Sequence, residues 1–374
     1  MRAPYATAVL DALAAQRLTK RTLVTVSHAV EQSALAAAED GPMVVFALFQ
    51  RLPYFERERR VYERIARSAA VTVVGMAAAQ APEMPAGVHV VLLDEKEELA
   101  REWTVVVLTP RFGAVLVAHD LEEFEAGAAT LESGRVFEGR SCFRRDEALH
   151  EVLRLRRQLG DRLSPAARSA VDMVVDRVRE LPATPGESRA DAALRVLGDR
   201  VERDHRRLRT TGIRAGAVTS PAGDTDIAGE PGVRRWVGAT GVTASGVLPV
   251  AVLAVRLTSP SGGPDAQIGR TALRQQQAAI DLLLARLRPG DRASKVGPAD
   301  FMVFLPALGH EEAVAFAYGL VTDFADAETR SGFLSARVTV AVTVTRRRPL
   351  PEEQLRQALE WAVAQNTSVV TIDG

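Results

Sequence analysis

The chain has 374 residues, with 47 Lys and Arg against 47 Asp and Glu, and 47% of its residues are hydrophobic. This length allows two or three separate cores, so a single compact domain is not expected. The balanced charge argues against nucleic-acid binding, and no apolar run approaches the roughly 20 residues of a membrane-spanning helix.

The only cysteine, Cys142, excludes an internal disulfide and a thiolate metal cluster. Residues 1–17 mix charges into a mildly apolar stretch and lack the layout of a secretory signal. We therefore expect a cytoplasmic protein that requires no metal or cofactor for its fold.

Residues 18–120 alternate short valine-rich runs with one-sided helical patterns. The runs predict buried strands at 42–50, 71–76, 88–94, 104–110 and 114–120. Stretches 26–40 and 54–70 space their apolar residues three or four positions apart, as amphipathic helices do. This alternation predicts an α/β domain, which we place at residues 1–145.

Residues 146–210 show no strand pattern and are predicted to form a helical connector and stem. Two amphipathic stretches, 146–163 and 164–181, precede a proline-containing break at 182–188. The charged helix that follows has apolar residues near heptad spacing, namely Leu194, Leu197, Val201 and Leu208. Such a stripe suits a dimerising stem, so we expect a homodimer.

The Gly/Pro/Asp-rich residues 210–232 are predicted to be a loop. The remaining elements are predicted as strand 247–257, helix 271–288, hairpin 293–306, helix 310–325, strand 336–345, helix 351–365 and strand 368–372. This β-α-β-β-α-β-α-β order, with an antiparallel hairpin at its centre, is typical of a ferredoxin-like or nucleotide-cyclase-like palm. We therefore expect an α+β palm domain at residues 211–374, and a mixed α/β (α+β) chain overall.

The palm region resembles the GGDEF domain of diguanylate cyclases over roughly residues 208–374. The resemblance rests on two strings, which read Arg288-Pro289-Gly290-Asp291 and Gly297-Pro298-Ala299-Asp300-Phe301. In that family the hairpin reads Gly-Gly-Asp/Glu-Glu-Phe, whose glycines let the backbone approach phosphates and whose acidic groups hold metal or assist catalysis. Here Pro298 removes a backbone donor, Ala299 removes a carboxylate, and Asp300 is one methylene shorter than Glu.

The register of the resemblance places Arg256 where the family has its first metal-binding aspartate. A cation at this position repels magnesium, on which nucleotidyl transfer depends. The resemblance therefore implies a degenerate domain that is not an enzyme, with a weak diguanylate cyclase as the less favoured reading.

Arg288 and Asp291 keep the register of the family's Arg-x-x-Asp inhibitory site, which implies a candidate cyclic di-GMP site. A guanidinium can donate to guanine O6 and N7, and a carboxylate can accept from guanine N1 and N2. The alternative is a solvated turn in an arginine-rich chain.

The N-terminal region looks like a DICT sensory domain over about residues 18–145. The matching motifs are Ser27-His28-Ala29-Val30-Glu31, Tyr54-Phe55-x-x-Glu58, Tyr62 and Glu102-Trp103. The resemblance implies a role in signal input and does not name the signal. His28 and His119 are candidates for pH sensing or ligand binding, against the alternative of ordinary surface or capped histidines.

A candidate sensory pocket comprises Phe49, Gln50, Tyr54 and Tyr62. These residues lie at the end of a predicted strand and on the following helix, the rim where ligands bind in open α/β sheets. The alternative is that the aromatic rings are core and that Gln50 caps a loop.

Together the two resemblances imply a non-catalytic bacterial signal-transduction protein. Its DICT-like domain would sense a signal and relay it to a degenerate GGDEF domain that binds cyclic di-GMP, a partner signalling protein or a second copy of the chain. The alternative is an oligomeric adaptor or scaffold with no nucleotide ligand.

Overall fold

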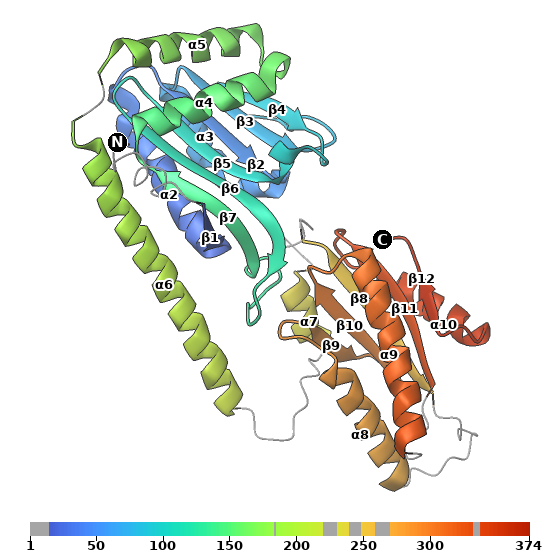
Figure 1. Cartoon of the computed structure of the whole chain (residues 1–374). Coiled ribbons are helices and arrows are strands. Elements are labelled where there is room, and N and C mark those ends of the chain that lie inside the picture. Colours follow the sequence, from blue (N-terminus) through green and yellow to red (C-terminus); the bar gives the residue numbers. More distant parts are fainter. Residues whose placement is uncertain (1–14, 183–184, 220–229, 239–247, 259–269, 332–336) are drawn as a thin grey trace, which may run out of the picture. The chain divides into compact units, whose positions relative to one another are not determined.

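The computed structural model describes residues 15–182, 185–219, 230–238, 248–258, 270–331 and 337–374 (Figure 1). The chain divides into two compact units. The N-terminal unit comprises Met1–Leu121 and Val136–Thr210, and the C-terminal unit comprises Glu122–Arg135 and Thr211–Gly374. Within the described residues, no helix combines the length and apolarity needed to cross a membrane.

The described part of the N-terminal unit contains a seven-stranded sheet, with strand order β1-β7-β6-β5-β2-β3-β4. The strands are β1 (Gln16–Thr19), β2 (Val44–Phe49), β3 (Val71–Ala77), β4 (Val88–Leu93), β5 (Glu102–Leu108), β6 (Gly113–Phe124) and β7 (Arg135–Cys142). β2, β3 and β4 run parallel, whereas β5 pairs antiparallel with both β2 and β6. The five predicted strands are confirmed as β2 to β6.

Strands β1 and β7 were not predicted from the sequence. They pair antiparallel with each other, from Gln16 opposite Gly139 to Thr19 opposite Val136. Their sequences, QRLT and RVFEGRSC, have neither a valine run nor a clean alternation. Backbone pairing, which any non-proline residue can make, holds these segments in the sheet.

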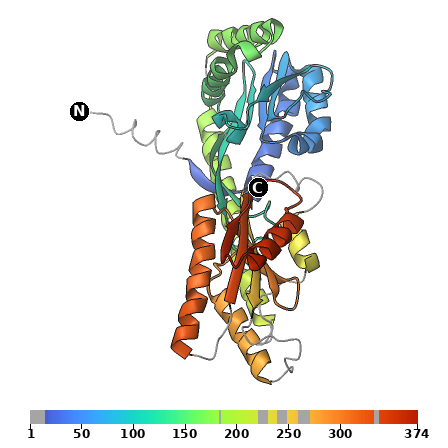
Figure 2. The ribbon, with the colours of Figure 1, turned by 90° about the vertical axis from the view of Figure 1, so that its right-hand side faces the viewer.

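Helices cover both faces of this sheet (Figure 2). The helices of the unit are α2 (Lys20–Ala36), η1 (Ala37–Glu39), α3 (Leu52–Ser68), η2 (Glu98–Arg101), α4 (Arg145–Leu159), η3 (Gly160–Arg162), α5 (Pro165–Glu180) and the beginning of α6 (Glu187–Thr219). Along β2, Val44, Phe46 and Leu48 share a core with α4 and α5. Val45, Ala47 and Phe49 share a core with α2 and α3. Burial on both faces explains why this strand is a continuous apolar run.

Helices α4 and α5 pack on the sheet of the N-terminal unit, although the sequence assigned residues 146–210 to a connector. Val152 and Leu155 of α4 and Val171 and Val174 of α5 are fully buried in the core that also contains Phe46. The amphipathic pattern of these helices is therefore explained by packing within one unit.

The described part of the C-terminal unit contains a five-stranded sheet with strand order β12-β11-β8-β10-β9. The strands are β8 (Val250–Thr258), β9 (Arg292–Lys295), β10 (Asp300–Pro306), β11 (Arg337–Thr345) and β12 (Val369–Thr371). The helices are α7 (Glu230–Val237), α8 (Arg270–Ala285), α9 (His310–Ser331) and α10 (Glu352–Ala364). From β8 onward the predicted element order is confirmed, and with it the palm.

The two faces of strand β8 divide this unit's core. Leu253 and Val255 pack with α8 and α9. Val252 and Ala254 pack with α7 and α10. Residues 122–135 also belong to this unit: Leu131 is buried in the second core, and its backbone N donates to the Trp236 carbonyl at 2.9 Å.

The predicted loop at 210–232 is wrong at both ends. Helix α6 continues to Thr219 and α7 begins at Glu230, while residues 220–229 lie outside the described residues. Val233 and Trp236 of α7 are buried, so tertiary packing stabilises a helix in a segment whose Gly and Pro content favours a loop. In α6 the predicted Leu208 also lies outside the residues whose side chains are described.

Candidate functional site

Arg256 and Asp300 face each other across adjacent strands of the palm. Arg256 lies near the end of β8, and the antiparallel register places it opposite Asp300, the first residue of β10. Arg256 donates from Nε to Asp300 Oδ1 at 2.7 Å and from Nη2 to Oδ2 at 3.0 Å. This bidentate pair raises the pKa of Arg256. A cavity of about 340 Å³ lies beside it, lined also by Arg356 and Glu360.

The Arg256–Asp300 pair does not fit a magnesium ion. Magnesium requires carboxylate oxygens, and both oxygens of Asp300 accept hydrogen bonds from the guanidinium group. The ion would also lie next to the positive charge of Arg256.

The structure brings Arg288 and Asp291 together in one tight turn. Asp291 Oδ2 accepts a hydrogen bond from the Arg288 backbone N at 2.7 Å, and Arg288 Nη2 donates to Asp291 Oδ1 at 3.2 Å. Gly290 has φ +106°, a conformation that residues with a side chain rarely adopt. The Asp291 side chain is 2% exposed, whereas that of Arg288 is 51% exposed. Asp291 therefore holds the turn, and Arg288 presents part of its guanidinium group to solvent.

The four residues of the predicted sensory pocket lie in the N-terminal unit. The rings of Phe49 and Tyr62 pack edge to face with centroids 5.4 Å apart, and both residues are buried. Gln50 Nε2 donates to the Arg101 carbonyl at 2.9 Å, and the Tyr54 ring lies beneath the Lys20 amine, 4.5 Å from Nζ. Phe49 and Tyr62 thus lie in the core, and Gln50 is hydrogen-bonded to the last residue of the helix η2.

A cavity of about 250 Å³ in the same unit lies elsewhere, against the stem helix α6. Its walls come from β1, α2, β7 and α6, and include Leu18, Val26, Phe143, Leu194 and Leu197. The sequence analysis did not predict this cavity, because its walls are far apart in the chain. In the sequence, the near-heptad spacing of Leu194 and Leu197 indicated an apolar face on this helix and did not indicate a cavity.

Two buried carboxylates attach α6 to the rest of the N-terminal unit. Asp191 is 1% exposed and accepts a hydrogen bond from the Phe143 backbone N at 2.9 Å. Glu202 is 7% exposed and accepts hydrogen bonds from the hydroxyl groups of Thr22 and of Thr19, the latter at 3.3 Å. Thr19 is also the N-cap of α2, so these contacts join the beginning of α2 to the stem.

Residues 5–121 match the sequence profile of the DICT family, described as a sensory domain in diguanylate cyclases and two-component systems. This confirms the predicted DICT domain. No curated protein matches the sequence.

The chain is also similar to solved GGDEF structures. The GGDEF domain of DgcB from Caulobacter crescentus, in complex with c-di-GMP, is 14% identical, with a TM-score of 0.33. The match covers 41% of this chain and 95% of the DgcB domain. Diguanylate cyclase SiaD from Pseudomonas aeruginosa, in complex with its activator SiaC, is 17% identical, with a TM-score of 0.36. The match covers 62% of this chain and 88% of the SiaD chain. A sensory-family match followed by a palm fits a signal-transduction protein.

Proposed function

We propose that this chain is a non-catalytic signal-transduction protein, in which the N-terminal unit receives an input and the palm relays it. The observation that carries this proposal is the Arg256–Asp300 pair. Arg256 stands where the resemblance to GGDEF domains places a metal-binding aspartate. Asp300, the carboxylate of the hairpin, is neutralised by that same arginine. At these two described positions, the palm therefore has no pair of unpaired carboxylates that could hold the metal ions of nucleotidyl transfer.

The test is an assay for cyclase activity. Purified full-length protein is incubated with GTP and either magnesium or manganese, and the nucleotides are separated by chromatography beside an active GGDEF protein. We expect no cyclic di-GMP above the protein-free control. Product that increases with protein concentration, and that is lost in Asp300→Ala, would overturn the proposal.

The proposed input acts through the cavity against α6. Leu194 and Leu197 of the stem line this cavity, so a small apolar ligand there would contact the stem directly. The buried carboxylates Asp191 and Glu202 fix the same helix on either side of these residues. A change in the packing of α6 is therefore the route by which we infer that the signal leaves the sensory domain.

Cyclic di-GMP is the candidate ligand of the palm. The exposed part of Arg288 can donate to guanine O6 and N7 or to phosphate, while the Asp291 carboxylate holds the turn that presents it. This geometry supports a role for Arg288 in binding and gives Asp291 a positioning role.

Isothermal titration with cyclic di-GMP tests this ligand. We expect binding to wild type, at least a roughly tenfold loss of affinity in Arg288→Ala, equivalent to about 1.4 kcal/mol, and no change in Arg347→Ala, which removes an exposed arginine of the same unit. An absence of heat in the wild type would contradict the receptor role. That result would favour the alternative hypothesis, in which the non-catalytic palm is an adaptor that binds only proteins.

Self-association through α6 completes the proposal. Val196 and Leu197 are adjacent apolar residues of this charged helix, and they are 63% and 59% exposed. Pairing with a second copy of α6 would bury them. We expect light scattering to show a dimer for wild type and for Asp199→Ala, and a monomer for Val196→Lys. A monomeric wild type at high concentration would rule out the homodimer.

A further inference from the structure

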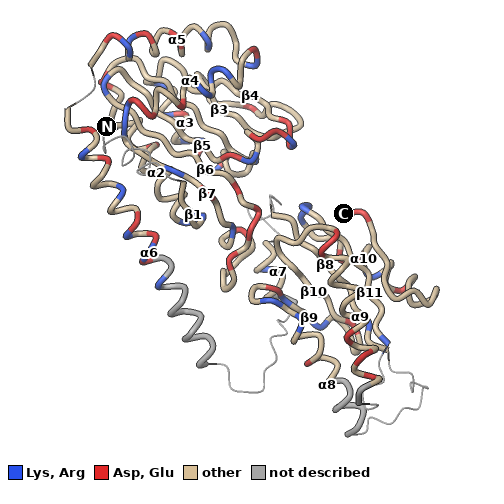
Figure 3. Tube along the Cα trace, viewed as in Figure 1, with Lys and Arg blue, Asp and Glu red and all other residues tan. Residues whose placement is uncertain are grey.

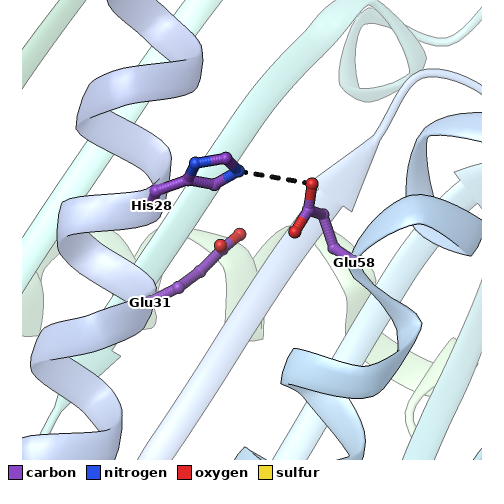
Figure 4. Close-up of side chains that lie close together, drawn as sticks. All are labelled: His28, Glu31 and Glu58. Atoms are coloured by element: carbon purple, nitrogen blue, oxygen red, sulfur yellow. Dashed lines mark hydrogen bonds and ion pairs between the residues drawn. The ribbon is translucent and has the colours of Figure 1, made fainter.

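The N-terminal unit places one histidine and two glutamates together on two helices. His28 and Glu31 lie one turn apart on α2, and Glu58 lies on α3 (Figure 4). One ligand atom from each residue can be chosen so that all three lie within 4.8 Å of one another. His28 Nε2 and Glu58 Oε1 are 3.3 Å apart. The group was not recognised as a unit in the sequence, where only His28 was a candidate.

The second oxygen of Glu31 has no hydrogen-bond partner in the described part of the chain. Glu31 is 1% exposed, and its Oε1 accepts hydrogen bonds from Ser27 Oγ at 3.2 Å and from Tyr62 OH at 3.1 Å. The carboxylate points toward the space between His28 and Glu58 (Figure 4). The hydrogen bonds from Ser27 and Tyr62 orient the Glu31 carboxylate, as hydrogen bonds from outer residues orient a metal ligand.

The charge balance at this place is incomplete. Burial, followed by the nearby Glu58, raises the pKa of Glu31 from 4.5 to about 7, while His28 and the hydrogen bonds from Tyr62 and Ser27 lower it. A buried carboxylate beside a second carboxylate is stabilised by a cation. Since the neutral imidazole of His28 offers a nitrogen lone pair, a bound metal ion can supply that charge.

We propose that His28, Glu31 and Glu58 bind a divalent transition-metal ion, with zinc as the best fit. Imidazole nitrogen suits zinc better than magnesium or calcium, and three protein ligands leave a position for water or an exogenous ligand. Two atoms each about 2.1 Å from a tetrahedral ion are roughly 3.4 Å apart, close to the His28–Glu58 separation. The half-exposed His28 side chain gives the ion a path from solvent.

The ion would bridge α2 and α3, the two helices on one face of the sheet. This proposal concerns only the N-terminal unit and does not depend on the catalytic state of the palm.

Calorimetric titration of zinc chloride into chelator-treated, tag-free full-length protein tests the site. We expect one ion per chain, a loss of affinity greater than roughly 100-fold in His28→Ala or Glu31→Gln, and a loss of roughly tenfold in Tyr62→Phe, which removes an outer hydrogen bond. The matched control is His150→Ala, which removes an exposed histidine from α4 and should bind as wild type does. Circular dichroism verifies that each variant is folded.

Three results would overturn the proposal: no binding to wild type, equal affinity in wild type and His28→Ala, or tighter binding of magnesium than of zinc. A cobalt-substituted sample gives a second readout. Its visible absorption bands should appear with wild type and His150→Ala and be absent with His28→Ala.

Discussion

Two carboxylates, Asp300 in the palm and Glu31 in the N-terminal unit, differ in how their negative charge is balanced. In the palm, the Arg256 guanidinium covers both oxygens of Asp300. In the N-terminal unit, Glu31 is held by the hydroxyl groups of Ser27 and Tyr62, with a second carboxylate nearby. A carboxylate whose charge is already compensated by an arginine binds a metal ion only weakly. A carboxylate that is hydrogen-bonded only by hydroxyl groups keeps its negative charge available for a metal ion.

The same contrast extends to protonation. Burial raises the pKa of Glu31, Tyr62 and Cys142 in the N-terminal unit, whereas in the palm a hydrogen bond to Asp300 raises the pKa of Arg256. Burial therefore favours the neutral forms of these three N-terminal groups, whereas the pairing with Asp300 favours the charged form of Arg256. Basic and acidic residues are nevertheless interspersed along the described chain, as Figure 3 shows. Total charge does not reveal this difference.

The largest expected effect concerns Cys142, the only cysteine, which lies in the N-terminal unit and is 1% exposed. Burial, followed by Asp191 and Glu147, raises the pKa of its thiol from 9.0 to about 12. At about pH 8 this leaves roughly a thousandth of the thiolate of an unperturbed cysteine. We expect Ellman's reagent to react at least about a thousandfold more slowly with the native chain than with the chain in guanidinium chloride. Similar rates would contradict the burial of this group.

The next effect concerns the Glu31 carboxylate. Its pKa is raised on folding, from 4.5 to about 7, so its contribution to stability is retained below pH 4.5 and lost as pH rises to about 7. A change of this size corresponds to about 3 kcal/mol. With chelator present, Glu31→Gln should therefore gain up to about 3 kcal/mol in free energy of unfolding over wild type at neutral pH and above.

Denaturant unfolding of the two proteins across this pH range measures that gain. Glu63→Gln is the control, because it removes a half-exposed carboxylate from α3. A gain in Glu31→Gln that is independent of pH would contradict the assignment.

A smaller effect is expected at the stem. Glu202→Ala removes the acceptor for the hydroxyl groups of Thr19 and Thr22, and should lower the free energy of unfolding of the N-terminal unit by about 1 to 2 kcal/mol. Hydrogen exchange should then be faster in residues 187–204. Asp199→Ala, an exposed change on the same helix, should leave exchange unchanged. Equal protection in both variants would show that Glu202 does not anchor α6.

The smallest effect is expected at the palm pair. The Arg256 and Asp300 side chains are each 27% exposed, so solvent screens their attraction. A double-mutant cycle of Arg256→Ala and Asp300→Ala should give a coupling of about 0.5 to 1 kcal/mol. A coupling near zero would mean that the two side chains do not pair in solution, and it would weaken the argument that Asp300 is unavailable to metal.

The sequence predicted the elements well where a pattern is local. The burial of every residue from Val44 to Phe49 follows from a continuous apolar run, and the element order of the palm follows from its strand and helix patterns. It missed β1 and β7, because neither has a valine run or a regular alternation, although Phe137 and Cys142 of β7 are buried in the core. It also assigned α4 and α5 to a connector, because an amphipathic face does not reveal which surface covers it.

The candidate sites also divide into those whose residues are close in the sequence and those that only the fold brings together. Arg288 and Asp291 are three positions apart, and the sequence placed them together; Arg256 and Asp300 required the register of β8 and β10. For the sensory pocket, the sequence selected Phe49 and Tyr62, which are core residues. A cavity in the same unit lies at a different place, where α6 meets β1, α2 and β7.

By itself, the sequence determined the two kinds of sheet, the sensory-family match and the changed hairpin Gly297 to Phe301, because these depend on periodicity and on residue identity. Only the tertiary structure decided which charges meet. Thr22 and Glu202 are 180 positions apart, and His28 and Glu58 are 30 apart on different helices. The physical reason is that packing on a shared sheet sets these distances, and neither local propensity nor composition carries that information.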